Sequence, residues 1–240
     1  MPTNRRNWLA IVAGAATGAA LLVTGFVGYL GYFGGPILRD APATAPVAMR
    51  GTRVLFLSGD MGINAGMGPR LIAALNRDGL PVLAFNSLTA FGTRRPPDEA
   101  AAIVAAAVAR AERMPGTSRV VLVGQSFGAD MLQFAGARLP QNLRPQVRQV
   151  ILLVPGNTLL FKASPGGVLD GRPDAPAGPS AQRLDWTPVT CIQGAGEAAS
   201  LCPLLHNPNV RRVALPGGHF LNYDVPLIAR TLREAIVNGR

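Results

Sequence analysis

The chain has 240 residues, 48% of them hydrophobic, and a net charge of +10. This length suits one domain with an appendage, and the excess of arginine favours an anionic partner, either nucleic acid or an acidic lipid surface. No arginine-rich block and no nucleic-acid-binding motif is present in the sequence, so we do not expect nucleic acid as a partner.

The first expected element is a membrane anchor. Residues 1–7 are polar and basic, and residues 8–35 carry no charged side chain, which is enough to cross a hydrocarbon layer of about 30 Å. A cleaved signal peptide has an apolar region of only about 7–15 residues, although Ala-x-Ala triplets at 41–48 keep cleavage open as an alternative. Arg5 and Arg6 precede the apolar run. The sequence therefore predicts a cytoplasmic tail, a single-pass anchor in the inner membrane and a periplasmic remainder.

A Pro- and Ala-rich linker is expected at 36–51, followed by a domain at 52–240. The expected strands cover 53–57, 81–86, 120–123, 147–154, 188–193 and 210–215, and the expected helices cover 67–78, 98–113, 131–138 and 225–237. This alternation predicts an α/β fold, with a mostly parallel sheet and helices on both faces. Residues 155–187 break the pattern and are expected to form either a lid or a surface excursion.

The sequence Gly124-Gln-Ser126-Phe-Gly128 lies between an apolar strand and a helical pattern. This is the setting of the nucleophile elbow, a tight strand-to-helix turn that exposes a serine above the sheet edge. The alternative is a structural turn without chemistry. We predict that Ser126 is the nucleophile.

A serine nucleophile needs a histidine to take its proton and return it to the leaving group. His219 follows the last expected strand, where α/β hydrolases carry this base. His206 lies in a polar loop and is expected to be a surface residue. Two histidines and two cysteines offer too few ligands for a zinc site, so we expect neither a metal nor a cofactor.

The acid that orients the histidine is less clearly marked. Glu197 follows the strand expected at 188–193 and matches the usual position after the penultimate strand. Asp130, Asp170 and Asp224 are the rivals. Asp130 is only four residues after Ser126, on the elbow helix, and is badly placed to hold the far side of an imidazole ring.

An oxyanion hole needs two backbone N–H donors. Phe127, the residue after the nucleophile, is expected to supply one, and Asp60 or Met61 in the loop after the first core strand is expected to supply the other. Cys191 and Cys202 bracket Glu197. Across the membrane they are free to form a disulfide that would stiffen the loop carrying the acid, and two buried free thiols are the alternative.

Several motifs together resemble one family. They read GDMG at 59–62, SLTAFGTRRP at 87–96, GQSFGAD at 124–130, CIQGAGE at 191–197, SLC at 200–202 and LPGGH at 215–219. In this order they resemble the bacterial virulence protein family VirJ/AcvB over residues 52–237. The resemblance implies a periplasmic α/β-hydrolase-like domain that hydrolyses aminoacylated phosphatidylglycerol, chiefly the lysyl form, with a link to type IV secretion in some members.

This chain departs from the family pattern at three places. Met61 replaces a glycine of the first loop, Ala90-Phe91-Gly92 replaces an aromatic cluster, and Phe220 replaces a second histidine. Arg95 falls where the family has an arginine and could pair with a lipid phosphate, or be a solvated loop residue.

Two hypotheses follow for the function. The first is a membrane-anchored periplasmic serine esterase acting on a membrane lipid such as lysyl-phosphatidylglycerol. The second is a hydrolase-fold adaptor in a virulence-related or type IV secretion-related envelope complex, with envelope proteins as partners. A peptidase or thioesterase using the same three side chains is a weaker third reading.

Overall fold

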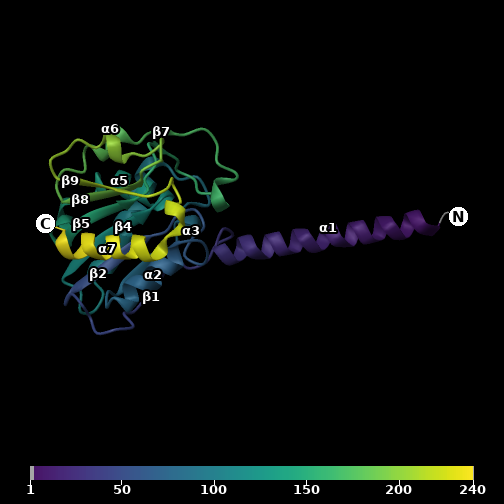
Figure 1. The fold of residues 1–240 in the computed structure, drawn as a ribbon, viewed down its shortest axis with the longest axis horizontal. Coiled ribbons are helices and arrows are strands. Elements are labelled where there is room, and N and C mark those ends of the chain that lie inside the picture. Colours follow the sequence, from purple (N-terminus) through teal and green to yellow (C-terminus); the bar gives the residue numbers. More distant parts are fainter. Residues whose placement is uncertain (1–2, 240) are drawn as a thin grey trace.

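The structure is a computed structural model that describes the backbone of residues 3–239 and the side chains of residues 8–239 (Figure 1). Its longest helix, α1 (Thr3–Leu30), projects away from the rest of the molecule. The segment Trp8–Leu30 has a mean hydropathy of 2.0, and its most apolar window is not buried in the protein. These features confirm an N-terminal apolar helix that is long enough to span a membrane.

The helix ends at Leu30, five residues before the end of the anchor expected at residues 8–35. Gly31 has φ 95°, a conformation that favours glycine and stops the helix. Of the expected cytoplasmic tail, residues 3–7 continue the helix, and residues 1–2 lie outside the described residues.

The domain is built on a seven-stranded sheet in the order β1-β3-β2-β4-β5-β8-β9. All neighbouring strands are parallel except β1, which pairs antiparallel with β3. The strands are β1 (Leu38–Ala41), β2 (Thr52–Leu57), β3 (Val82–Phe85), β4 (Arg119–Gln125), β5 (Val147–Leu153), β8 (Val189–Gly194) and β9 (Val210–Leu215). This confirms the predicted α/β-hydrolase type of sheet.

The expected linker at 36–51 is not a linker throughout, because residues 38–41 form β1 at the edge of the sheet. Asp40 accepts a 2.8 Å ion-pair contact from Arg53, and Asn86 donates its backbone N–H to Ile37 O. These contacts lie far apart in the sequence, so local Pro and Ala content could not indicate them.

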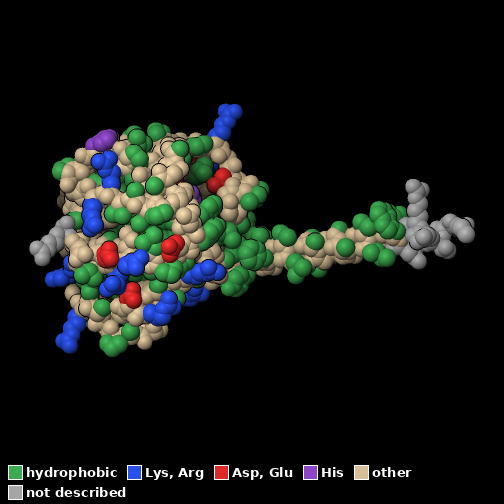
Figure 2. Space-filling view, in the orientation of Figure 1, with side chains coloured by type: hydrophobic (Ala, Val, Ile, Leu, Met, Phe, Trp, Pro, Cys, Tyr) green, Lys and Arg blue, Asp and Glu red, His purple; other side chains and the backbone are tan. Residues whose placement is uncertain are grey.

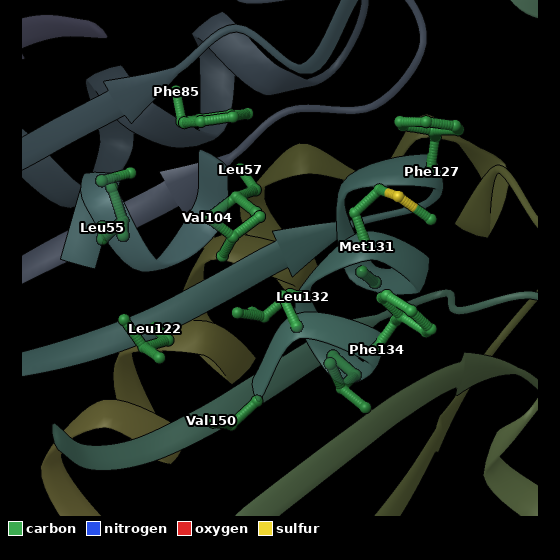
Figure 3. Close-up of a cluster of buried hydrophobic side chains, with 14 of the residues drawn as sticks. Leu55, Leu57, Phe85, Val104, Leu122, Phe127, Met131, Leu132, Phe134 and Val150 are labelled. Atoms are coloured by element: carbon green, nitrogen blue, oxygen red, sulfur yellow. The ribbon is translucent and has the colours of Figure 1, made fainter. Parts of the chain in front are cut away.

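Helices cover both faces of the sheet. They are α2 (Gly68–Arg77), α3 (Ser87–Phe91), α4 (Pro97–Glu112), α5 (Phe127–Gly136), α6 (Gly178–Ala181) and α7 (Val225–Asn238), with short 3-10 turns η1 (Gln141–Gln146), η2 (Pro165–Gly167), η3 (Cys202–Leu204) and η4 (Leu221–Tyr223). On one face α4 and α5 bury Val104, Leu132 and Phe134 against Leu122 and Val150 of the sheet (Figure 3). On the other face α2 and α7 pack on the alternate strand residues.

The segment 155–187 is folded onto the domain rather than hanging free. It contains the two-stranded pair β6 (Thr158–Leu159) and β7 (Ala175–Pro176), and its residues Leu159, Phe161 and Ala177 join the hydrophobic core. Near η2 its side chains become exposed, and Gly166 reaches the cavity described below. The segment is therefore mainly a packed excursion, with one short stretch beside the cavity.

Cys191 in β8 and Cys202 in η3 form a disulfide, and both residues are fully buried. The closed loop contains Glu197. Replacing both cysteines by alanine is expected to lower the free energy of unfolding by about 3 kcal/mol, because the unfolded chain regains the entropy of an open loop of this length. Urea unfolding of the full chain in detergent measures the change. A reductant should destabilise the wild type and leave the double variant unaffected. Equal urea midpoints for the two proteins without reductant would contradict the expectation.

Candidate active site

The nucleophile elbow lies where β4 ends and α5 begins. Ser126 has φ 50° and ψ −124°, a strained conformation for a residue other than glycine. A Cβ at Gly124 would lie 2.6 Å from Ala129 Cα, and one at Gly128 would lie 2.3 Å from Ser58 O. The two glycines therefore permit the close approach of strand and helix that holds the serine in this turn.

His219 reaches Ser126 from the loop after β9. Its Nε2 lies 2.8 Å from Ser126 Oγ, within hydrogen-bonding distance. The imidazole is about a third exposed, with 38% of its side-chain surface accessible, so a reacting group can approach it from solvent. This contact joins two residues 93 positions apart, because the carboxyl ends of parallel strands meet at one edge of the sheet.

Glu197 lies behind His219, in the loop after β8. Its Oε1 is 2.5 Å from His219 Nδ1, and its side chain is 6% exposed. The second carboxylate oxygen accepts the backbone N–H of Gly194 at 3.4 Å. In this arrangement Nδ1–H donates to the carboxylate, which leaves Nε2 to accept the serine proton.

The three rival acids make other contacts. Asp130 accepts the N–H of Gly156, Asp170 accepts the hydroxyl of Ser164, and Asp224 accepts the N–H of Leu227 at the start of α7. Among the described residues, Glu197 is the carboxylate that contacts the ring of His219.

The loop after β2 lies beside the serine. A Cβ at Gly59 would be 3.5 Å from Ser126 Cβ, and Gly62 closes the turn by donating its N–H to Gly59 O. Phe127 is the first residue of α5, so helix geometry leaves its N–H without an intrahelical acceptor. Asp60 and Met61 line the cavity that holds Ser126, and with Phe127 they stay the predicted donors to an oxyanion.

A cavity of about 340 Å³ opens over Ser126 and His219. Its walls are mainly apolar, with Met61, Met67, Val154, Phe220 and Tyr223 among the lining residues. Met61, which replaces a family glycine, contributes its side chain to this wall and faces Gly166. The sequence reasoning missed this wall, although two aromatic residues within four positions of His219 were a signal for it.

Asp60 lines the cavity, and Asp170 lies close to Asp60. A Cβ at Gly167 would lie 3.3 Å from Asp170 Oδ2 and 3.6 Å from Asp60 Oδ2. Burial raises the pKa of Asp60, the neighbouring charge of Asp170 raises it further, and His219 acts in the opposite direction. Asp60 thus places an acidic side chain in the cavity that holds the nucleophile, in a protein whose net charge is +10.

Burial raises the pKa of Asp130 well above its usual range, and Glu197 and Asp60 add to the shift, while the Gly156 N–H opposes it. An acid whose pKa is higher in the folded state destabilises the fold once the pH exceeds its unfolded value near 3.8. Asp130→Asn keeps an acceptor for Gly156 and removes this cost. We expect the variant to be more stable than the wild type at pH 7.

The gain should shrink as the pH falls below the unfolded pKa, because both proteins then carry a neutral side chain. Denaturant midpoints measured from pH 3 to pH 8 test this. Asp185→Asn, a change at an exposed carboxylate, is the matched control. An Asp130→Asn variant that is less stable at every pH would contradict the expected effect.

Arg95 does not line the catalytic cavity. Its guanidinium contacts Glu99 at 2.8 Å and the carbonyl of Ala90, and it borders a separate surface hollow with Arg94 and Arg138. His206 is exposed in a loop.

The fold and the arrangement of the site are those of an α/β hydrolase. The structure resembles Est1E from Butyrivibrio proteoclasticus (TM-score 0.59, 17% identity, 84% of this chain and 92% of the other). It also resembles Rv0554 from Mycobacterium tuberculosis (TM-score 0.61, 16% identity, 85% of this chain and 93% of the other). A third similar structure is the Pyrococcus furiosus esterase Pf2001 (TM-score 0.59, 14% identity, 79% of this chain and 82% of the other). At these identities the likeness shows the fold.

The family model for the bacterial virulence protein VirJ matches residues 51–239, which is most of the chain. The protein therefore belongs to the VirJ family, and the family resemblance found in the sequence is confirmed. None of the curated protein sequences compared with it matches significantly.

Proposed function

We propose that this protein is a membrane-anchored periplasmic serine hydrolase that cleaves the aminoacyl ester of aminoacylated phosphatidylglycerol, in particular the lysyl form. The observation that carries the proposal is the continuous contact from Ser126 through His219 to Glu197. The helix α1 supports a lipid substrate, because it keeps the site beside a bilayer. Membership of the VirJ family supports the substrate class.

The proposed reaction proceeds in two halves. Ser126 Oγ attacks the ester carbonyl while its proton passes to His219 Nε2, and the carbonyl oxygen takes up negative charge facing Phe127 N–H and the loop at 59–62. The C–O bond to the glycerol then breaks, and the proton on His219 goes to the leaving alkoxide. Water, deprotonated by His219, then attacks the aminoacyl–serine ester. The bond from the acyl carbon to Ser126 Oγ breaks, His219 returns the proton to Oγ, and the free amino acid leaves.

An aminoacyl ester carries a free ammonium group close to the reacting carbonyl. Asp60 lies in the cavity beside Ser126, with Asp170 next to it. Opposite charges attract more strongly in a partly desolvated cavity than in water. These two carboxylates support a cationic acyl group, whereas the positive charge of the whole domain suits the acidic lipid surface around it.

Asp60→Asn is expected to raise KM for lysyl-phosphatidylglycerol about tenfold and to leave the hydrolysis of a small neutral ester nearly unchanged. In the wild type, KM for the cationic lipid should rise as the pH falls through the raised pKa of Asp60, because the protonated carboxyl no longer attracts an ammonium. Steady-state kinetics on both substrates measure the two effects. Asp185→Asn is the control, and equal losses on the two substrates would remove Asp60 from headgroup recognition.

The function itself is tested with the full-length protein in vesicles that contain lysyl-phosphatidylglycerol. We expect release of free lysine and recovery of phosphatidylglycerol, with the Ser126→Ala protein as the blank. Release of fatty acid instead would identify a different ester as substrate. Equal lysine release by both proteins would overturn the proposal.

The adaptor hypothesis requires a site that has lost its chemistry. The contacts among Ser126, His219 and Glu197 support the enzyme instead. Failure of a fluorophosphonate probe to label Ser126 in the folded protein would reverse this preference.

A further inference from the structure

The junction between α1 and the domain has no spacer. Leu30, the last residue of α1, is completely buried, and its carbonyl accepts a 3.1 Å hydrogen bond from Asn86 Nδ2. Asn64 Nδ2 donates to Tyr29 O at 2.7 Å, and Thr89 Oγ1 donates to Gly31 O at 2.9 Å. The end of the apolar helix is therefore fixed directly to the domain.

The part of the domain that holds α1 is also the part that borders the nucleophile. At one end of the loop, a Cβ at Gly62 would lie 2.7 Å from Leu30 O. At the other end, Gly59 packs against Ser126. The carboxyl ends of the strands thus lie on the side of the domain from which α1 projects (Figure 1).

Large apolar side chains are exposed around the same side. Phe33, Val168, Leu169, Phe220 and Tyr223 are each more than half exposed, and we call them the apolar collar. Figure 2 shows apolar side chains gathered where α1 meets the domain. Exposed apolar groups collected at one place indicate a contact surface rather than ordinary surface variation.

The backbone next to the collar residues Phe220 and Tyr223 is strained. Leu221, Asn222 and Tyr223 have φ values of 48°, 53° and 55°, in the left-handed region that non-glycine residues rarely adopt. The rings of Phe220 and Tyr223 stack at 5.4 Å and line the cavity. Backbone strain beside two exposed aromatic rings at the cavity favours a functional role for those rings, such as contact with a ligand or a surface.

We propose that the apolar collar rests in the interfacial layer of the same bilayer that α1 crosses, so that a lipid headgroup enters the cavity directly from the membrane. The 23-residue helical segment Trp8–Leu30 is about 34 Å long, just enough for the hydrocarbon layer. Since Leu30 is both the end of that helix and part of the domain core, the adjoining surface must lie at the level of the headgroups. Tyr29, Tyr223 and the phenylalanines are side chains suited to that layer.

The proposal rests on the proposed function for the identity of the substrate, but the membrane contact can be measured without hydrolysis. Leu169→Cys and Val237→Cys are prepared in the full chain, and the new thiol is labelled with an environment-sensitive fluorophore. Leu169 belongs to the collar, whereas Val237 is an exposed apolar residue near the end of α7, on the opposite side from α1 (Figure 1). The disulfide leaves Cys191 and Cys202 unreactive.

In vesicles that contain nitroxide-labelled phospholipid, we expect strong quenching of the label at position 169 and little at position 237. Equal quenching at the two positions would overturn the proposal. A second copy of the chain seated on the collar is the competing occupant. It would give self-quenching at position 169 that disappears when the protein is diluted with lipid, with no response to the nitroxide, and it would also overturn the proposal.

A second measurement uses catalysis. The double variant Val168→Asp/Leu169→Asp is expected to hydrolyse the lipid substrate in vesicles about tenfold more slowly than the wild type. Hydrolysis of a soluble short ester should be unchanged, and Val237→Asp should affect neither substrate. If the label at 169 is quenched but no lipid is hydrolysed, the proposed function fails and the membrane contact stands. An equal loss of activity on the lipid and on the soluble ester would show that the substitutions damage the site. The comparison of quenching at positions 169 and 237 then decides whether the collar contacts the membrane.

Discussion

Ser126→Ala is expected to lower kcat for ester hydrolysis by about 10⁴-fold or more, with a much smaller change in KM. The hydroxyl 2.8 Å from His219 Nε2 is the group that forms the acyl intermediate in the proposed reaction. Without it, the histidine and the oxyanion donors can only assist direct attack by water. Kinetics with a small chromogenic ester measure the loss.

Labelling with a fluorophosphonate gives a readout that is independent of substrate. The wild type should be modified at Ser126 and lose activity in proportion, whereas Ser126→Ala should not react. Ser118→Ala, a change at an exposed serine, is the matched control and should behave as the wild type. Modification at another residue, or activity that survives in Ser126→Ala, would contradict the assignment of the nucleophile.

The core of the fold could be predicted because its signals are local. Buried parallel strands read as short apolar runs, and the strand expected at 53–57 corresponds to β2, whose six residues are all buried. The errors fall where distant contacts decide. Residues 38–41 form an edge strand, which is held by the ion pair between Asp40 and Arg53. The apolar helix ends at Leu30, where the domain binds its last residue.

The residues of the candidate site also divide into those with local sequence signals and those that depend on distant contacts. Ser126 and His219 lie in motifs that are recognisable from neighbouring residues, since the elbow and the loop after the last strand have local signatures. Glu197 could only be ranked among four acids, because the choice depends on which carboxylate meets His219 in space. The proximity of Asp60 and Asp170 could not be predicted from the sequence, because Asp60 lies in the loop after β2 and Asp170 lies in the excursion near η2.

Glu197→Gln is expected to lower kcat by about 10⁴-fold, because the amide no longer requires the histidine tautomer with its proton on Nδ1. An amide N–H facing Nδ1 would favour the proton on Nε2, where it blocks acceptance of the serine proton. The distance of 2.5 Å between Glu197 Oε1 and His219 Nδ1 is the basis for this expectation. Glu234→Gln, at an exposed position on α7, is the matched control.

Two further measurements distinguish orientation of the ring from simple damage. Glu197→Asp keeps the charge and should recover part of the activity, whereas Asp130→Asn should keep most of it, because Asp130 contacts Gly156 and not the histidine. Urea midpoints should show that Glu197→Gln stays folded, since the disulfide still closes the loop around it. If Asp130→Asn were as inactive as Glu197→Gln, the acid of the triad would have to be reassigned to α5.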